Sequence, residues 1–293
     1  MGFLPRPCFD WQLRARVLRL GERTLLMAIV NLTPDSFSGD GLADVALDQV
    51  VGAALEHLDG GADILDLGAE STRPGAEPLS ADAEQARLLP AIEAVLRERP
   101  AAIISVDTYH AVTARTAVRA GAQIVNDVSG LLWDEGMAAA VADTRAGLVL
   151  MHTRGRPADW RTQPPLASAE LLPLVLGQLR ERLAVAEAAG IAADRIVLDP
   201  GFGFGKRGPE NFTLLAGFSR IAELGRPTLA GLSRKGFLGD AVAAGDGQSR
   251  LNATTAANVA AILAGAHIIR VHDLQPAREA AAVADAILRT SES

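Results

Sequence analysis

A short pattern recurs along this chain: a glycine, a small residue, a short apolar run and then a polar residue. Three copies carry the glycine: Gly61-Ala-Asp-Ile-Leu-Asp66, Gly121-Ala-Gln-Ile-Val-Asn126 and Gly265-Ala-His-Ile-Ile-Arg270. Glycine commonly ends helices, and short apolar runs are typical of strands buried in parallel sheets. Each copy therefore predicts a helix end followed by a strand whose carboxyl end carries a polar side chain. Similar runs without the glycine occur at residues 25–30, 103–107, 148–152, 196–199 and 227–231.

Amphipathic segments separate these strands and complete the pattern. Helical periodicity occurs from Val45 to Leu58 and at residues 83–97, 111–120, 171–189, 253–264 and 276–288. Strand followed by helix, about eight times in a chain of 293 residues, predicts an α/β fold of the TIM (β/α)8 barrel type. A doubly wound open sheet is the alternative, but it requires a topological switch point and usually has fewer units.

The chain shows no linker or change in composition, so we expect a single domain. The barrel is predicted to span residues 25–290, after a short N-terminal extension at residues 1–24. Three apolar residues of the extension, Leu13, Val17 and Leu18, are expected to pack across the bottom of the barrel. The proline-rich stretch from Thr153 to Leu166 is expected to be a surface loop.

Charge and cysteine content exclude several classes of protein. The net charge of −7 argues against a nucleic-acid binder, and 49% hydrophobic residues suit a large globular core. The single cysteine, Cys8, excludes a disulfide framework within the chain and is typical of a reducing cytosol, so we expect a cytoplasmic protein. The most apolar stretch, from Ala253 to Val271, contains polar residues and is predicted to be a buried helix and strand. We therefore expect no membrane partner.

The stretch from Ile196 to Lys206 indicates a ligand-binding loop. Pro200 ends the strand at Asp199, and three glycines then allow positive φ angles or a close approach to a ligand. It is not a Walker A loop, because Pro200 and Arg207 stand where that motif needs glycine and a hydroxyl residue. Three glycines fit G-x-G-x-x-G, but the strand and acidic residue of a dinucleotide site are missing. A plain glycine turn is the remaining alternative, although it leaves the acid, two phenylalanines and the lysine unexplained.

Polar residues stand at the predicted carboxyl ends of the strands, where TIM barrels build their active sites. They are Asn31, Asp66, Asp107, Asn126, His152, Asp199, Arg270 and His272. Basic residues nearby indicate an anion-binding mouth, with a solvated charged rim as the alternative; they are Arg73, Arg234, Lys235, Arg270 and His272. The acids and amides suit a flat heterocycle with several N–H donors. Met151 and Phe204 are candidates to pack on its ring, with core packing as the alternative.

Metal chemistry is predicted only in a limited form. No group of cysteines and histidines has zinc-site spacing. Asn31 beside a diphosphate would suit Mg²⁺, which prefers a few protein oxygens together with phosphate and water. A serine nucleophile is not supported, because the chain has no G-x-S-x-G elbow.

Eight motifs occur in a fixed order along the chain. They are Ile29-Val-Asn-Leu-Thr-Pro-Asp-Ser-Phe-Ser38, Gly68-Ala-Glu-Ser-Thr-Arg-Pro-Gly75, Ile104-Ser-Val-Asp-Thr108, Ile124-Val-Asn-Asp-Val-Ser-Gly130, Leu150-Met-His152, Asp199-Pro-Gly-Phe-Gly-Phe-Gly-Lys206, Gly231-Leu-Ser-Arg-Lys235 and Arg270-Val-His-Asp273. Together they resemble the dihydropteroate synthase family, over the span from about Leu25 to Leu288. The resemblance implies a Mg²⁺-dependent transferase of folate biosynthesis that works as a TIM-barrel homodimer. It would condense 6-hydroxymethyl-7,8-dihydropterin diphosphate with 4-aminobenzoate and release pyrophosphate.

The resemblance also implies roles for matched residues. The catalytic set would be Asp107, Lys235, Arg270 and His272. The pterin would be held by Asp107, Asn126, Asp199 and Lys235, with Met151 against its ring. The 4-aminobenzoate site, where sulfonamides compete in this family, would be shaped by Thr72, Arg73, Phe204, Ser233 and Arg234. The diphosphate would meet Asn31, Arg270 and His272, and Asn31 would also be the Mg²⁺ ligand.

The first loop departs from the family pattern. The family usually has Ser-Asp-Gly-Gly where this chain has Ser38-Gly-Asp-Gly41, so the loop acid, Asp40, is displaced by one position. This departure permits one alternative, a pterin-binding paralogue without catalytic activity, although the intact Asp199, Lys235, Arg270 and His272 favour the synthase. A second alternative is a pterin methyltransferase that works with a corrinoid partner, and the Ser-Arg-Lys and Arg-Val-His motifs favour the synthase over it.

Overall fold

The computed structural model describes residues 3, 5–32, 42–70, 78–242 and 247–290 of the chain. Eight parallel strands form one sheet in the order β8-β7-β6-β5-β4-β3-β10-β9. The strands are β3 (Leu25–Asn31), β4 (Ile64–Gly68), β5 (Ile104–Asp107), β6 (Ile124–Asp127), β7 (Gly147–Met151), β8 (Ile196–Asp199), β9 (Leu229–Ala230) and β10 (Ile268–Val271). A parallel bridge between Leu198 of β8 and Thr228, the residue just before β9, connects the two ends of this strand order. The sheet thus closes into a TIM barrel; the doubly wound alternative is wrong.

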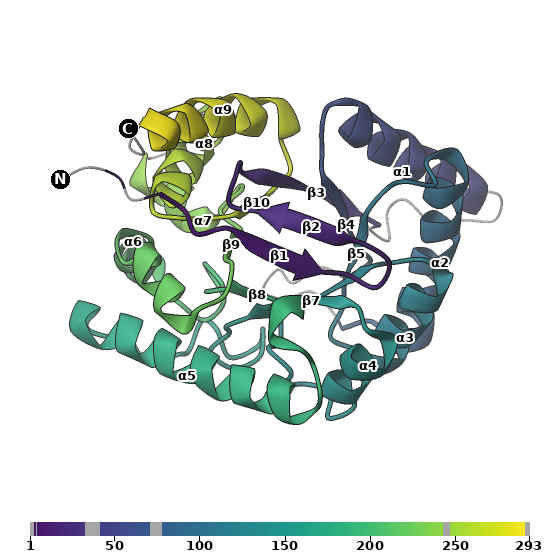
Figure 1. Ribbon diagram of the computed structural model, residues 1–293, viewed down its shortest axis with the longest axis horizontal. Coiled ribbons are helices and arrows are strands. Elements are labelled where there is room, and N and C mark those ends of the chain that lie inside the picture. The colour runs from purple at the N-terminus through teal and green to yellow at the C-terminus, as the bar shows by residue number, and fades with distance from the viewer. Residues whose placement is uncertain (1–2, 4, 33–41, 71–77, 243–246, 291–293) are drawn as a thin grey trace.

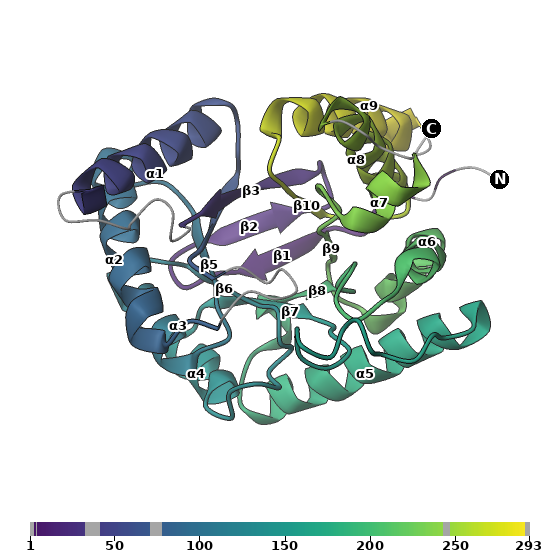
Figure 2. The same cartoon turned by 180° about the vertical axis from the view of Figure 1, so that it is seen from behind.

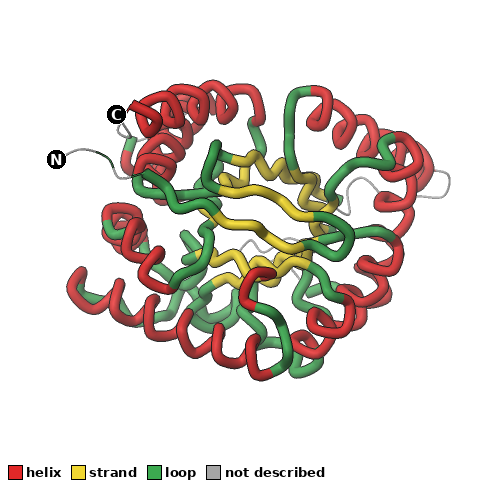
Figure 3. The backbone as a smooth tube through the Cα atoms, in the orientation of Figure 1, coloured by secondary structure: helices red, strands yellow, loops and turns green. Residues whose placement is uncertain are grey.

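Helices surround this barrel on its outer side (Figures 1 and 3). They are α1 (Leu42–Asp59), α2 (Ala81–Glu98), α3 (Ala111–Ala120), α4 (Met137–Thr144), α5 (Ser168–Ala188), α6 (Gly208–Ala216), α7 (Gly236–Ala241), α8 (Gly247–Leu263) and α9 (Leu274–Thr290). The six predicted helical segments all correspond to helices in this ring. Helices α4, α6 and α7 were not predicted, because six to nine residues give little periodic contrast, and α4 is also largely alanine.

Side-chain alternation divides each strand between two environments. On β3, Leu26, Ala28 and Val30 belong to the core between the strands and the helices. The other set faces into the barrel, and its first members, Leu25 and Met27, join a second apolar cluster inside it. Most of the strands contribute one such residue to this inner cluster near their amino ends. The amino end of the barrel is therefore filled with apolar side chains, which leaves room for polar side chains only near the carboxyl end.

A β-hairpin covers the amino end of the barrel, as Figure 1 shows and Figure 2 confirms from behind. Its strands are β1 (Phe9–Gln12) and β2 (Val17–Leu20), which pair in antiparallel fashion. Trp11, Leu13 and Leu20 are buried in the inner cluster, and Leu18 packs against it. The prediction for Leu13 and Leu18 is confirmed, whereas that for Val17 is wrong. Val17 is 49% exposed, because alternation along β2 turns it away from the barrel.

No helix within the described residues is long and apolar enough to cross a membrane. The apolar stretch near residues 253–271 forms the end of α8 followed by β10, as predicted.

The hairpin generates a prediction about stability. Trp11 is fully buried, and its Nε1 donates to the carbonyl oxygen of Arg195 at 2.8 Å. Trp11→Ala would leave a cavity at the barrel bottom, so the free energy of unfolding should fall by about 3–5 kcal/mol. The control is Val17→Ala on the same hairpin, which should change it by no more than about 0.5 kcal/mol. Urea denaturation would measure both, and equal values for the two variants would contradict the described packing.

Candidate functional site

A pocket with a volume of about 280 Å³ opens at the carboxyl ends of the barrel strands. Its polar walls continue the inward-facing side-chain series that begins with the apolar inner cluster. On β3, Ile29 and Asn31 follow Leu25 and Met27 on the same face. The residues that line the pocket are Ile29, Asn31, Glu70, Asp107, Asn126, Val128, Met151, Asp199, Phe202, Phe204, Gly231, Ser233, Arg234, Lys235, Arg270 and His272.

A network of ion pairs and hydrogen bonds forms the floor of this pocket. Arg270 donates from Nε to Asp66 Oδ2 at 2.6 Å and from Nη2 to Asp107 Oδ2 at 2.7 Å. Asn126 Nδ2 donates to the same Asp66 oxygen at 3.0 Å. Burial raises the pKa of the Asp107 carboxyl, and the charge of Arg270 opposes that shift. Asp66 itself is fully buried, so its role is to hold Arg270 and Asn126 at the pocket surface.

Asp199 stands where β8 turns into the glycine-rich loop. Its Oδ1 accepts a hydrogen bond from the backbone N–H of Gly201 at 2.7 Å, which fixes the start of the loop. Burial raises the pKa of Asp199, while Lys235 and Lys206 oppose this shift. Gly201 has a φ of +68°, and a Cβ atom there would lie 1.9 Å from the carbonyl oxygen of His152. A glycine is therefore required at this position for the loop to pack against the end of β7.

Lys206 stabilises the same loop from beneath and does not line the pocket. Its Nζ donates to the carbonyl oxygens of Gly201 at 2.6 Å, His152 at 3.3 Å and Phe204 at 3.3 Å. Burial lowers the pKa of this ammonium to about 7. The lysine therefore joins the two loops that follow β7 and β8, a structural role that the sequence pattern does not reveal.

Lys235, the only other lysine of the chain, faces the pocket. Its Nζ lies 4.2 Å from the centre of the Phe204 ring, a cation–π contact. Burial lowers the pKa of Lys235 to about 8, against the attraction of Asp199. Trp160 packs edge-on against Phe204 with the ring centres 4.8 Å apart, so the aromatic wall is held from behind.

The mouth of the pocket carries less positive charge than the sequence suggested. Burial, together with Arg234 and Arg270, lowers the pKa of His272 to about 4, so its imidazole is neutral near pH 7. His272 Nδ1 lies 3.1 Å from Ser233 Oγ, which also accepts the backbone N–H of His272. Arg234 forms a two-point ion pair with Asp273, at 3.0 and 2.6 Å. Counting His272 among the cations was therefore wrong.

The structure brings together most of the residues that the sequence predicted for the site. Those that line the pocket are Asn31, Asp107, Asn126, Met151, Asp199, Phe204, Ser233, Arg234, Lys235, Arg270 and His272. Thr72 and Arg73 lie outside the described residues, as does the displaced loop acid Asp40. Glu70 also lines the pocket and was not singled out, although its place just after β4 was an available signal.

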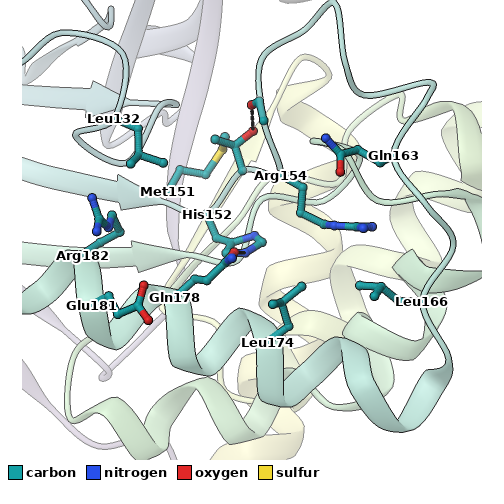
Figure 4. Close-up of a pocket in the computed structure, with 12 residues that line it drawn as sticks. Leu132, Met151, His152, Arg154, Gln163, Leu166, Leu174, Gln178, Glu181 and Arg182 are labelled. Atoms are coloured by element: carbon teal, nitrogen blue, oxygen red, sulfur yellow. Dashed lines mark hydrogen bonds between the residues drawn. The ribbon is translucent and has the colours of Figure 1, made fainter.

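His152 is a strand-end residue that, like the buried Asp66, does not line this pocket. Met151 faces the barrel, so the next residue points to the other side, toward α5. There His152 Nε2 lies 2.7 Å from Gln178 Oε1, and burial lowers the pKa of the imidazole well below its usual value. It lines a separate cavity of about 470 Å³ between α5 and the loop after β7 (Figure 4). Met151 lines both cavities and so forms part of the wall between them.

Comparison with known proteins identifies the family. The sequence profile of the pterin binding enzymes matches residues 27–272 of this chain. The dihydropteroate synthase of Bacillus subtilis is 40% identical over 267 residues, which cover 91% of this chain and 90% of that protein. The Xanthomonas albilineans enzyme, solved with 4-aminobenzoic acid, is 40% identical with a TM-score of 0.85 and coverage of 96% and 98%. The Yersinia pestis enzyme, solved as a sulfonamide complex, is 36% identical with a TM-score of 0.87 and coverage of 97% and 100%. The chain belongs to the dihydropteroate synthase family of pterin-binding enzymes.

Lys206 makes stability depend on pH in a defined direction. Its pKa of about 7 in the fold lies below the 10.5 of an exposed lysine, so the unfolded chain binds the proton more tightly. The cost of burying the ammonium is fully present below pH 7 and is relieved as the pH rises toward 10.5. In the parent protein, this relief raises the free energy of unfolding as the pH rises from about 7 toward 10.5. Lys206→Met should lack that rise, because methionine carries no proton to release. Urea denaturation at several pH values would test it, with the exposed neighbour Arg207→Met as control. A pH profile of Lys206→Met parallel to that of the parent would contradict this account.

Proposed function

We propose that this chain condenses 6-hydroxymethyl-7,8-dihydropterin diphosphate with 4-aminobenzoate to give 7,8-dihydropteroate and pyrophosphate. One observation carries the proposal. Asp107, Asn126 and Asp199 converge with Lys235 and Arg270 in a single pocket of a chain that belongs to the dihydropteroate synthase family. Acceptors for a heterocycle and cations for a diphosphate are thus present side by side.

The buried acids and the amide are proposed to bind the pterin. Asp199 keeps one carboxylate oxygen free of the Gly201 contact, and this oxygen can accept N–H groups from the ring edge. Asn126 uses its amide N–H on Asp66, so its carbonyl oxygen is the group directed to a ligand. Met151 is proposed to pack on the ring, which agrees with its place in the pocket wall. Lys235 supplies a donor on the same side as Asp199.

The diphosphate is proposed to bind toward Asn31, Arg270 and His272. Asn31 ends β3 at the pocket, where its side-chain oxygen is a ligand of the kind Mg²⁺ prefers. The residues therefore fit this cation, and diphosphate and water oxygens would complete its coordination. When bound, Mg²⁺ would neutralise negative charge on the departing pyrophosphate. His272, being neutral, can donate a hydrogen bond to a phosphate oxygen without adding charge.

The 4-aminobenzoate is proposed to bind near Phe204, Ser233 and Arg234, with Thr72 and Arg73 contributing from the first loops. Phe204 offers an aromatic wall and Arg234 a charged partner for a carboxylate. The relatives solved with 4-aminobenzoic acid and with a sulfonamide support this class of ligand. Sulfonamides are accordingly proposed to compete at the same place.

The proposed reaction needs groups that stabilise the departing diphosphate more than it needs a strong general base. The aniline nitrogen of 4-aminobenzoate is neutral near pH 7 and is already nucleophilic. As the C–O bond to the diphosphate breaks, Arg270 can stabilise negative charge, and Asp107 and Asp199 can stabilise positive charge on the pterin. We therefore propose a dissociative displacement without a covalent enzyme intermediate. A homodimer and a cytoplasmic location are proposed from the family resemblance, and light scattering after gel filtration would test the first.

Pyrophosphate release tests the proposed activity. With Mg²⁺ and the dihydropterin diphosphate, purified protein should release pyrophosphate only when 4-aminobenzoate is added. Asp107→Asn should reduce kcat/KM by roughly 10²-fold or more, because it removes a charge beside the reacting pterin. Asp82→Asn on the exposed face of α2 makes the same chemical change away from the pocket and is the control. Pterin binding without release would favour a paralogue without catalytic activity, and full turnover by Asp107→Asn would remove the role given to this residue.

The pKa of Lys235 predicts the alkaline limit of the reaction. In the free enzyme this lysine loses its charge above about pH 8, so kcat/KM should fall as the pH rises beyond that value. Lys235→Arg keeps a positive charge throughout this range. Its kcat/KM is expected to be lower at the optimum but to lack the decline above about pH 8. An unchanged alkaline decline in Lys235→Arg would show that another group causes it.

A further inference from the structure

Two acids and a histidine form a cluster beside the substrate pocket. The proposed reaction gives this cluster no role. Glu70 follows β4, Glu84 lies in the first turn of α2, and His110 precedes α3. One potential ligand atom from each of the three residues lies within 4.8 Å of the other two. Three separate segments of the chain thus direct metal-binding side chains to one place.

Glu84 is the buried member of this Glu–Glu–His cluster. Its side chain is 1% exposed, and its Oε2 accepts from Thr108 Oγ1 at 2.9 Å and lies 3.1 Å from His110 Nδ1. Its Oε1 has no hydrogen-bond partner among the described residues. A buried carboxylate oxygen without a partner is costly, because nothing replaces the water that it loses on folding. The carboxylate therefore retains capacity to bind a further positively charged group.

The neighbouring residues hold the other two ligands in place. Tyr109 donates its hydroxyl to the Glu70 carboxylate, whose two oxygens lie at 2.8 and 2.9 Å. The ring of Tyr109 also packs against that of His110, with centres 4.4 Å apart. Burial raises the pKa of Glu70, and the negative charge of Glu84 adds to the shift. Two carboxylates, one buried and one partly buried, thus face a single partly buried imidazole, which favours a cation.

One proton can bridge His110 and Glu84, but it cannot also reach Glu70. A divalent cation bonded at about 2.0–2.2 Å to each ligand could bring all three together. Imidazole nitrogen and carboxylate oxygens form a ligand set suited to zinc and similar ions, whereas Mg²⁺ prefers oxygen alone. Three protein ligands would leave one position of a tetrahedral ion for water.

We propose that Glu70, Glu84 and His110 bind a divalent transition-metal ion of the zinc class, at a site separate from the Mg²⁺ of the proposed reaction. The ion would connect the segments after β4 and β5 and would fix Glu70, which lines the substrate pocket. The binding does not depend on the proposed activity and is tested without turnover.

Calorimetric titration of zinc into the metal-free protein tests the proposal. Cys8 is exposed and could bind zinc by itself, so the parent for this experiment is Cys8→Ser. Excess Mg²⁺ in the buffer keeps an oxygen site near Asn31 occupied. We expect one zinc per chain, and an affinity that falls by more than about tenfold in Glu84→Gln and in His110→Gln. Glu93→Gln, which changes an exposed glutamate on the same helix, is the matched control and should bind like the parent.

Thermal unfolding gives a second readout that separates binding from misfolding. Zinc should raise the midpoint of the parent and of Glu93→Gln, but not that of Glu84→Gln or His110→Gln, because a ligand stabilises only the state that binds it. Glu84 is buried, so loss of binding in Glu84→Gln could also come from unfolding. His110 is partly exposed, so loss of binding in His110→Gln cannot be explained in that way. The absence of saturable zinc binding in the parent would overturn the proposal. So would unchanged affinity in both cluster variants.

Discussion

Arg270 lies between two carboxylates at the floor of the barrel, and the arrangement of the pocket depends on that contact. The guanidinium is shared by Asp66 and Asp107, and Asp66 also holds Asn126. Removing one member of such a buried set leaves the others charged without a partner, which is strongly unfavourable. These contacts also determine which groups remain available to ligands. Asp66 is buried and does not line the pocket, whereas Asp107 and Asn126 do. The geometry that stabilises the floor is therefore the same geometry that presents it to a substrate.

The alternation of side chains along the strands explains how much the sequence could predict. The repeated strand-helix units identified the barrel, and position at a strand end placed Asp107, Asn126, Asp199 and Arg270 together. That placement is confirmed because all four also occupy inward-facing positions. Side-chain alternation could have excluded His152, which follows the inward-facing Met151 and so must face α5. The failure came from treating a polar residue at a strand end as sufficient, without checking its face.

Other features depend on contacts between distant segments, and no local pattern could have predicted them. The neutral state of His272 follows from burial beside Arg234 and Arg270, which approach it only in the fold. The role of Lys206 depends on carbonyl groups contributed by two loops. The hairpin at the amino end of the barrel consists of two four-residue strands, which are too short for the sequence pattern to predict their pairing. In each case a tertiary contact determines the feature.

The distribution of amines in this chain has a spectroscopic consequence. Its only two lysines are Lys206 and Lys235, and both contact Phe204: the first donates to its backbone carbonyl oxygen, and the second lies over its ring. A sample grown with ¹⁵N-labelled lysine would therefore carry its side-chain label only at the edge of the pocket. One amine signal would report the loop that supports the pocket and the other its interior, without background from the rest of the surface.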